Sequence, residues 1–131
     1  MKKILFILLL LSSICRGQNT LIDEGVIDEG VITNSLIYTI TTTGSHTIPT
    51  VNGYTYNFVV NWGDGNSNSV TSYNVGNSHT YSGSGTYTIT ITGTCQYLEF
   101  YGTTAATQII RITSFGKVGI TNTSFMFYGC T

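Results

Sequence analysis

The side chains best suited to chemistry gather in one turn near the middle of the chain. Asp64, Asn66 and Asn68 alternate along this turn, which is the spacing that opens an EF-hand calcium loop. Such a loop needs glycine at its sixth position and glutamate at its twelfth, where this chain has Ser69 and Val75. The EF-hand motif therefore fails, and we expect no metal. A looser calcium site is the weaker hypothesis, and a turn held by side-chain hydrogen bonds is the preferred one.

Nucleophilic catalysis has equally little support. Asp64 and His79 could be joined to a serine, and Cys95 to His79, but no Gly-x-Ser-x-Gly sequence and no cysteine-protease signature occurs. Asp64 and Glu99 are the only acidic residues between 36 and 116, which is too few to build a hydrolase pair. No lysine follows a glycine-rich loop, so a phosphate cradle is also excluded. We therefore predict a protein that is not an enzyme, with no catalytic residues and no cofactor.

The composition narrows the classes of partner. Of the 131 residues, 8% are charged, against about 25% in an average globular protein. Five Lys and Arg residues cannot form the basic patch that nucleic-acid binding needs. Aromatic residues make up 12% of the chain, whereas disordered chains are poor in them. We expect a folded domain that does not bind nucleic acid.

The first 17 residues predict export. Lys2 and Lys3 form a basic start, and residues 4–11 form an unbroken apolar run. This pattern is typical of a secretory signal peptide, with cleavage near Gly17. The apolar run is shorter than the roughly 20 residues of a membrane helix, so we expect no transmembrane span. The predicted location is therefore secreted or cell-surface.

A lipoprotein signal is the alternative at this end. It would lipidate and retain Cys15, but Ile14 stands where such signals have a small residue, so a lipid anchor is disfavoured. After loss of the signal peptide the chain would have two basic residues, Arg111 and Lys117, and six acidic residues.

Residues 18–35 hold a short tandem repeat. Leu-Ile-Asp-Glu-Gly is followed by Val-Ile-Asp-Glu-Gly at 21–30, and the repeat carries four of the six acidic residues. Clustered carboxylates can bind calcium, but a site needs 6–8 oxygens in a fixed shell. An exposed acidic arm is the preferred interpretation.

The two cysteines after the signal peptide are Cys95 and Cys130. Export permits a disulfide between them, and buried free thiols are the preferred alternative. No Cys-x-x-Cys pair is present to suggest a zinc or redox site.

The remaining chain has the period-2 alternation of β-strands. Aromatic and β-branched residues alternate with polar ones over 54–62 and 86–92, with Val59 as the one apolar exception. Shorter strands are predicted at 36–42, 78–81, 96–101 and 108–113, separated by glycine-rich turns. About six strands in some 80 residues indicate an all-β sandwich. We expect a polar loop between residues 65 and 79, and no helix before residue 120.

One set of motifs in this region is more specific. A strand ends in Trp-Gly-Asp-Gly, and His-x-Tyr and Gly-Thr-Tyr follow. The residues concerned are Trp62, Gly63, Asp64, Gly65, His79, Tyr81, Gly85 and Tyr87. This pattern resembles the polycystic kidney disease (PKD) type of immunoglobulin-like β-sandwich. In physical terms, the tryptophan fills the core, the glycines allow positive φ and the aspartate caps the turn. The histidine braces the turn.

A narrower resemblance extends in both directions. Residues 47–50, 92–94 and 97–100 resemble the amino-terminal module of BspA-like surface proteins, and so do residues 109–116. That family commonly has tryptophan where this chain has Phe115, so the match is imperfect there. Residues 125–131 resemble the opening of that family's leucine-rich repeat. The resemblance implies a sandwich at 36–116 and a partial first repeat at 117–131, in a chain truncated within that repeat.

The resemblance implies a non-catalytic surface protein. Its sandwich would display or space an adhesive leucine-rich-repeat region that binds host, matrix or cell-surface proteins. The alternative is a carbohydrate-binding accessory module of a secreted protein, since tyrosine-rich faces stack on sugar rings. That alternative requires an exposed platform among Tyr38, Tyr54, Tyr56, Tyr97 and Tyr101. The expected partner is thus an extracellular protein or a glycan.

Overall fold

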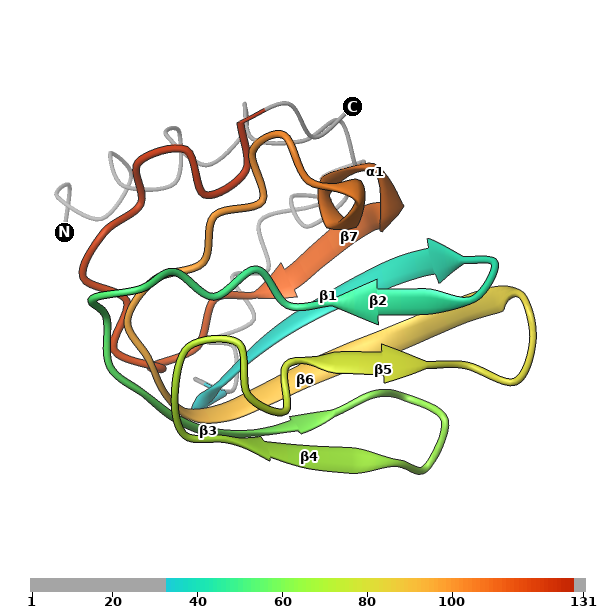
Figure 1. Ribbon diagram of the computed structural model, residues 1–131, viewed down its shortest axis with the longest axis horizontal. Helices are drawn as coiled ribbons and strands as arrows, with labels where there is room; N and C mark the ends of the chain where they lie inside the picture. Colours follow the sequence, from blue (N-terminus) through green and yellow to red (C-terminus); the bar gives the residue numbers. More distant parts are fainter. Residues whose placement is uncertain (1–32, 129–131) are drawn as a thin grey trace, which may run out of the picture.

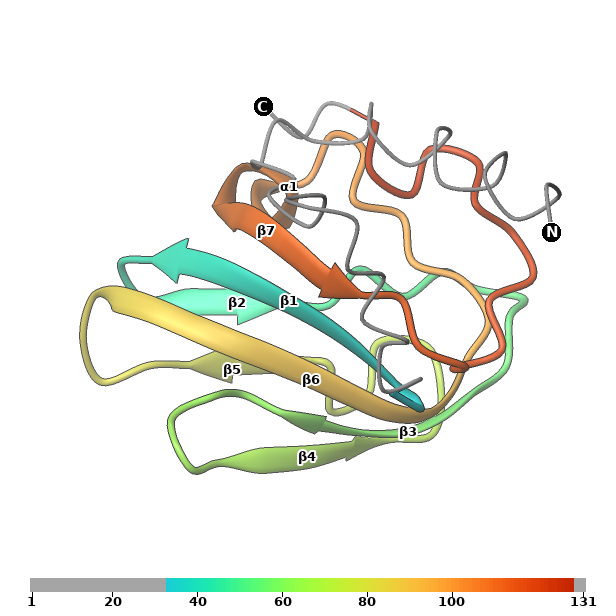
Figure 2. The same cartoon turned by 180° about the vertical axis from the view of Figure 1, so that it is seen from behind.

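The computed structural model describes residues 33–128 and contains two antiparallel sheets. The larger sheet has the strand order β4-β3-β6-β1-β7. Its strands are β1 (Ser35–Thr42), β3 (Tyr56–Asn61), β4 (Ser67–Val70), β6 (Gly85–Cys95) and β7 (Ile109–Ser114). The smaller sheet pairs β2 (Ser45–Thr47) with β5 (Ser78–Thr80). Figure 1 shows the smaller sheet over one face of the larger, and Figure 2 shows the other face.

The prediction of an all-β fold is confirmed for this part of the chain, and its two layers are sandwich-like. The predicted signal peptide at 1–17, the acidic repeat at 21–30 and the partner thiol Cys130 lie outside the described residues.

The strands form because alternate side chains reach a buried layer. In β3, Tyr56, Phe58 and Val60 are buried while the residues between them are exposed, including Val59 at 49%. Trp62 continues this inward series and is fully buried. In β6 the buried residues are Ile89, Ile91 and Cys95, and threonines occupy the other face. Period-2 patterning thus placed these residues correctly.

The core lies between the two sheets. Tyr38 from β1 and His46 from β2 are both buried and hydrogen-bond across the gap, with 3.0 Å between Oη and Nε2. Ile48 follows β2 and Tyr81 follows β5, and both are buried in the same cluster. Complete burial of a large apolar side chain contributes about 1.5–3 kcal/mol, so this layer is the main source of stability.

The prediction of no helix before residue 120 is wrong. Helix α1 (Thr104–Gln108) lies between β6 and β7. Thr103 caps it by accepting a hydrogen bond from the Ala106 amide, and Ala105 and Ala106 are buried. A helix of five residues is too short to show a 3.6-residue pattern in the sequence.

The strand predicted at 96–101 is also absent. Tyr97 and Leu98 are consecutive and both buried, which a half-buried strand does not allow. Amides of this segment bond instead to loop carbonyls, Gln96 to Thr55 and Glu99 to Pro49.

Two strands were not predicted. β4 lies within the expected polar loop, and β2 has only three residues. Both lack the apolar alternation that identifies a strand, because only Val70 of β4 and His46 of β2 are buried.

The segment after β7 packs against the segment after β6. The Cys95 amide donates to the Val118 carbonyl at 2.6 Å, and the Phe100 amide donates to the Met126 carbonyl at 3.1 Å. Val118 and Met126 are buried in the same core cluster as the strands. The predicted boundary between a sandwich and a first repeat at 116/117 stays a prediction, since these contacts do not identify a repeat.

Candidate functional site

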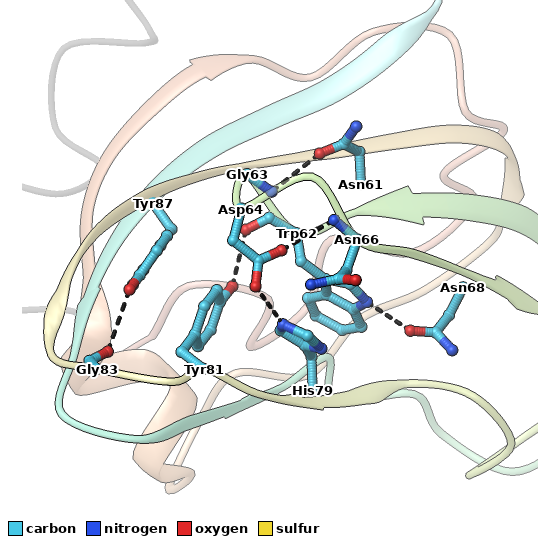
Figure 3. Close-up of polar contacts among 10 residues, drawn as sticks. All are labelled: Asn61, Trp62, Gly63, Asp64, Asn66, Asn68, His79, Tyr81, Gly83 and Tyr87. Carbon is cyan, nitrogen blue, oxygen red and sulfur yellow. Dashed lines mark hydrogen bonds and ion pairs between the residues drawn. The ribbon is translucent and has the colours of Figure 1, made fainter.

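Six of the eight residues of the PKD-like pattern lie close together at one end of the sheets in Figure 3, namely Trp62, Gly63, Asp64, His79, Tyr81 and Tyr87. Trp62, at the end of β3, is fully buried, and its indole Nε1 donates to the Asn68 Oδ1 atom of β4 at 2.6 Å. The Trp62 amide donates to the Asn66 carbonyl at 3.0 Å and closes the turn. A buried indole N–H needs an acceptor, so Asn68 permits complete burial of Trp62. The sequence suggests Asn68 only as a potential cation ligand.

The turn itself depends on two glycines. Gly63 and Gly65 have φ of +82° and +93°, a region that side chains with a Cβ rarely adopt. At Gly63 an added Cβ would lie 2.6 Å from the carbonyl oxygen of Thr88, whereas at Gly65 it would meet open space. Gly63 is therefore required both by its conformation and by the close approach of β6.

Asp64 holds the turn to the second sheet. Its Oδ1 accepts the Asn66 amide at 3.0 Å, and its Oδ2 accepts the His79 Nε2 at 2.7 Å. The hydrogen bond from His79 lowers the pKa of Asp64 to about 2. The His79 ring in turn stacks on Trp62, with centroids 5.2 Å apart and planes 15° apart. His79 thus braces the turn by one hydrogen bond and one ring contact.

Two tyrosines complete the stack. The Tyr81 hydroxyl donates to the Trp62 carbonyl at 2.9 Å, and burial raises the pKa of this phenol. Its ring lies edge-on to His79 and stacks on Tyr87 with centroids 3.9 Å apart. The Tyr87 hydroxyl donates to the Gly83 carbonyl at 3.1 Å, and Gly85 lies against the Tyr87 ring. Trp62, His79, Tyr81 and Tyr87 are called the Trp62 cluster below.

The polar atoms of this site serve the fold. A cation at Asp64, Asn66 and Asn68 would compete with the turn amide, with His79 and with the indole for the oxygens of Asp64 and Asn68. Among residues 33–128, no group of three or more His, Cys, Asp or Glu side chains could hold a metal ion. The hydrogen bonds and ring contacts of this site link β3, β4, β5 and β6 to one another.

Cys95 is the one nucleophilic thiol in the described part of the chain. It is fully buried, and burial raises its pKa to about 12. Because the thiolate is the reactive form, the Cys95 thiol is inert at neutral pH. It behaves as a small core residue.

A second buried polar network was missed from the sequence. His46 is 2% exposed, its Nδ1 donates to the Gln108 Oε1 at 2.6 Å, and Tyr38 contacts its Nε2. The Gln108 amide nitrogen also donates to Thr42 Oγ1 at 3.0 Å and to the Ser45 carbonyl at 2.8 Å. Burial lowers the pKa of His46, which favours the neutral ring. No local signal could have found this network, because His46 and Gln108 are 62 positions apart.

The five tyrosines named for the carbohydrate-binding alternative do not form the exposed platform that it requires. Tyr38, Tyr56 and Tyr97 are 0–4% exposed, and the Tyr56 hydroxyl donates to the Tyr97 carbonyl at 2.8 Å. Tyr54 is half-buried, and Tyr101 alone of the five is well exposed. Tyr38, Tyr56 and Tyr97 belong to the core because their hydroxyls find hydrogen-bond partners inside the protein.

Comparison with known proteins identifies no relative: no family model, no curated protein and no solved structure matches the chain. No helix within residues 33–128 is long and apolar enough to cross a membrane.

Proposed function

We propose that the protein is a non-catalytic, exported surface module that displays or spaces an adhesive leucine-rich-repeat region. The observation that carries the proposal is the internal use of the polar atoms around Trp62. Asp64, Asn68 and Tyr81 all bond within the protein, and together they join both sheets at one end. Such a network stabilises a rigid spacer without requiring a ligand.

Two features of the sequence add support. The basic and apolar start is typical of a secretory signal, and the module has few charged residues. The PKD-like and BspA-like patterns connect it with surface adhesion and with repeats after residue 116. The partners under this proposal are host, matrix or cell-surface proteins.

The test uses the complete reading frame expressed in its own host. Antibody labelling of intact cells should detect the protein outside the cell. The purified full-length protein should bind immobilised collagen, fibronectin or laminin in biolayer interferometry. Deletion of any repeats encoded after Thr131 should abolish this binding. Retention of the protein inside the cell, or no binding to any of the three, would overturn the proposal.

Carbohydrate binding is the second candidate function, and one observation favours it. Tyr101 and two aromatic side chains near the end of the described chain, Phe125 and Tyr128, are exposed and in mutual contact.

A further inference from the structure

Three large aromatic side chains that are not part of the Trp62 cluster form an exposed cluster. Tyr101, Phe125 and Tyr128 are 50%, 58% and 63% exposed. The centroid of the Tyr101 ring is 5.8 Å from that of Phe125 and 5.0 Å from that of Tyr128, and the last two are 6.1 Å apart. Exposed apolar side chains are common singly, whereas contiguous apolar patches of about 300–600 Å² are often functional. These three residues are called the exposed cluster below.

The backbone holds Phe125 in an unusual conformation. Its φ is +57°, in the left-handed region that bulky residues rarely occupy. Its neighbours are fixed, because Met126 is buried and Phe127 stacks on Phe100 with centroids 5.3 Å apart. The chain therefore keeps the Phe125 ring in water although neither burial nor backbone preference favours it. An observed strain of this kind points to a functional position.

The chemistry of the exposed cluster selects the kind of ligand. None of the three residues is charged, and the described chain has only four charged side chains in all: Asp64, Glu99, Arg111 and Lys117. The rings of Tyr101 and Phe125 both stand steeply to that of Tyr128, at 68° and 85°. They form a corner with apolar faces and two phenol hydroxyls. A pyranose ring has matching features, namely apolar C–H faces and hydroxyls at its rim.

The size of the exposed cluster favours a small ligand over a protein partner. A fully buried aromatic residue covers 150–250 Å², so three half-exposed ones offer roughly 300 Å². A stable protein interface needs about 800 Å² per partner. One or two sugar units fit the smaller area. We propose that Tyr101, Phe125 and Tyr128 form a binding site for a chain of neutral hexoses, a site independent of any downstream repeat region.

The test compares the exported protein with a Phe125→Gly variant. Glycine relieves the left-handed strain while it removes the ring, so the variant should fold with an unchanged or raised melting temperature. The probes are cellohexaose, laminarihexaose, maltohexaose and mannohexaose, measured by isothermal titration calorimetry. We expect the wild-type protein to bind at least one of them. Phe125→Gly and Tyr101→Ala should each weaken that binding about tenfold or more.

Tyr73→Ala is the matched control, because Tyr73 is 44% exposed and lies outside the exposed cluster. This variant should bind as the wild type does. Absence of binding to all four hexasaccharides would overturn the proposal, and so would equal binding by Phe125→Gly and wild type. Sedimentation of the wild type as a dimer that Tyr101→Ala dissociates, without sugar binding, would instead assign the surface to self-association. Failure of matrix-protein binding would leave this result untouched, so the two proposals fail separately.

Discussion

The Trp62 cluster and the exposed cluster differ in whether their polar groups bond inside the protein. In the Trp62 cluster, Trp62 and Tyr81 are buried and their indole and phenol groups bond inside the protein. In the exposed cluster, Tyr101 and Tyr128 are at least half exposed and stand beside a strained Phe125. Aromatic side chains thus stabilise the fold where the protein provides a hydrogen-bond acceptor for their polar group. Where their rings are exposed to solvent, they are available for contact with a ligand.

Removal of the central ring should have the largest effect. Trp62→Ala would leave a cavity in the core and remove the indole that donates to Asn68. We expect it to lower the free energy of unfolding by about 3–5 kcal/mol, measured by urea denaturation. A loss below about 1 kcal/mol would show that the Trp62 cluster is not a structural centre.

The turn offers a matched pair of glycine substitutions. Gly63→Ala should lower the free energy of unfolding by about 2 kcal/mol or more, because the new Cβ would strike the Thr88 backbone. Gly65→Ala meets open space and should cost only the conformational strain, about 1 kcal/mol. Equal losses in thermal or urea denaturation would contradict the close approach of β6 to the turn.

The Asp64–His79 bond should appear in the acid dependence of stability. The folded pKa of Asp64 is lowered from 3.8 to about 2, so the unfolded state binds more protons between these values. Its contribution is therefore complete above pH 3.8 and is lost as the pH falls through about 2. Asp64→Asn should be less stable than wild type at pH 5, and the difference should shrink by pH 2. A constant difference in urea midpoint across this range would contradict the assignment.

His46 contributes in a higher pH window. Because burial lowers its pKa from 6.5, stability should fall as the pH drops below 6.5, when the unfolded state takes up a proton first. His46→Gln should remove this part of the dependence while it keeps a hydrogen-bonding side chain. The check is the melting temperature of both proteins at pH 7.5 and 5.5, and identical slopes would refute the neutral buried histidine.

The Trp62 turn was predictable because its signals are local. Period-2 burial, glycines with positive φ and a capping aspartate all lie within ten residues of Trp62. β4 was not predicted because its residues are mostly polar. It is a strand because it pairs with β3 in a hairpin, and that pairing leaves no apolar alternation in the sequence. The strand predicted at 96–101 failed because apolar residues there are buried by packing from residues 118–126, which no local pattern reports.

The exposed cluster was equally hard to foresee. The sequence groups Tyr101 with four tyrosines that the fold buries or half-buries, and it indicates the start of a repeat at Phe125 and Tyr128. Exposure depends on which rings find acceptors and neighbours in the folded protein, and those partners are distant in sequence. The Tyr56 hydroxyl, for example, bonds to a carbonyl 41 positions away.

One paired measurement tests most directly whether the Trp62 cluster stabilises the fold while the exposed cluster binds a ligand. Tyr81→Phe removes the hydroxyl that bonds to the Trp62 carbonyl, and should lower the free energy of unfolding by about 1–3 kcal/mol while hexasaccharide binding stays unchanged. Phe125→Gly should show the opposite: an unchanged or slightly raised melting temperature and a loss of hexasaccharide binding. This assignment of roles would be contradicted if both variants changed the same property, or if Phe125→Gly unfolded the protein and Tyr81→Phe left its stability intact.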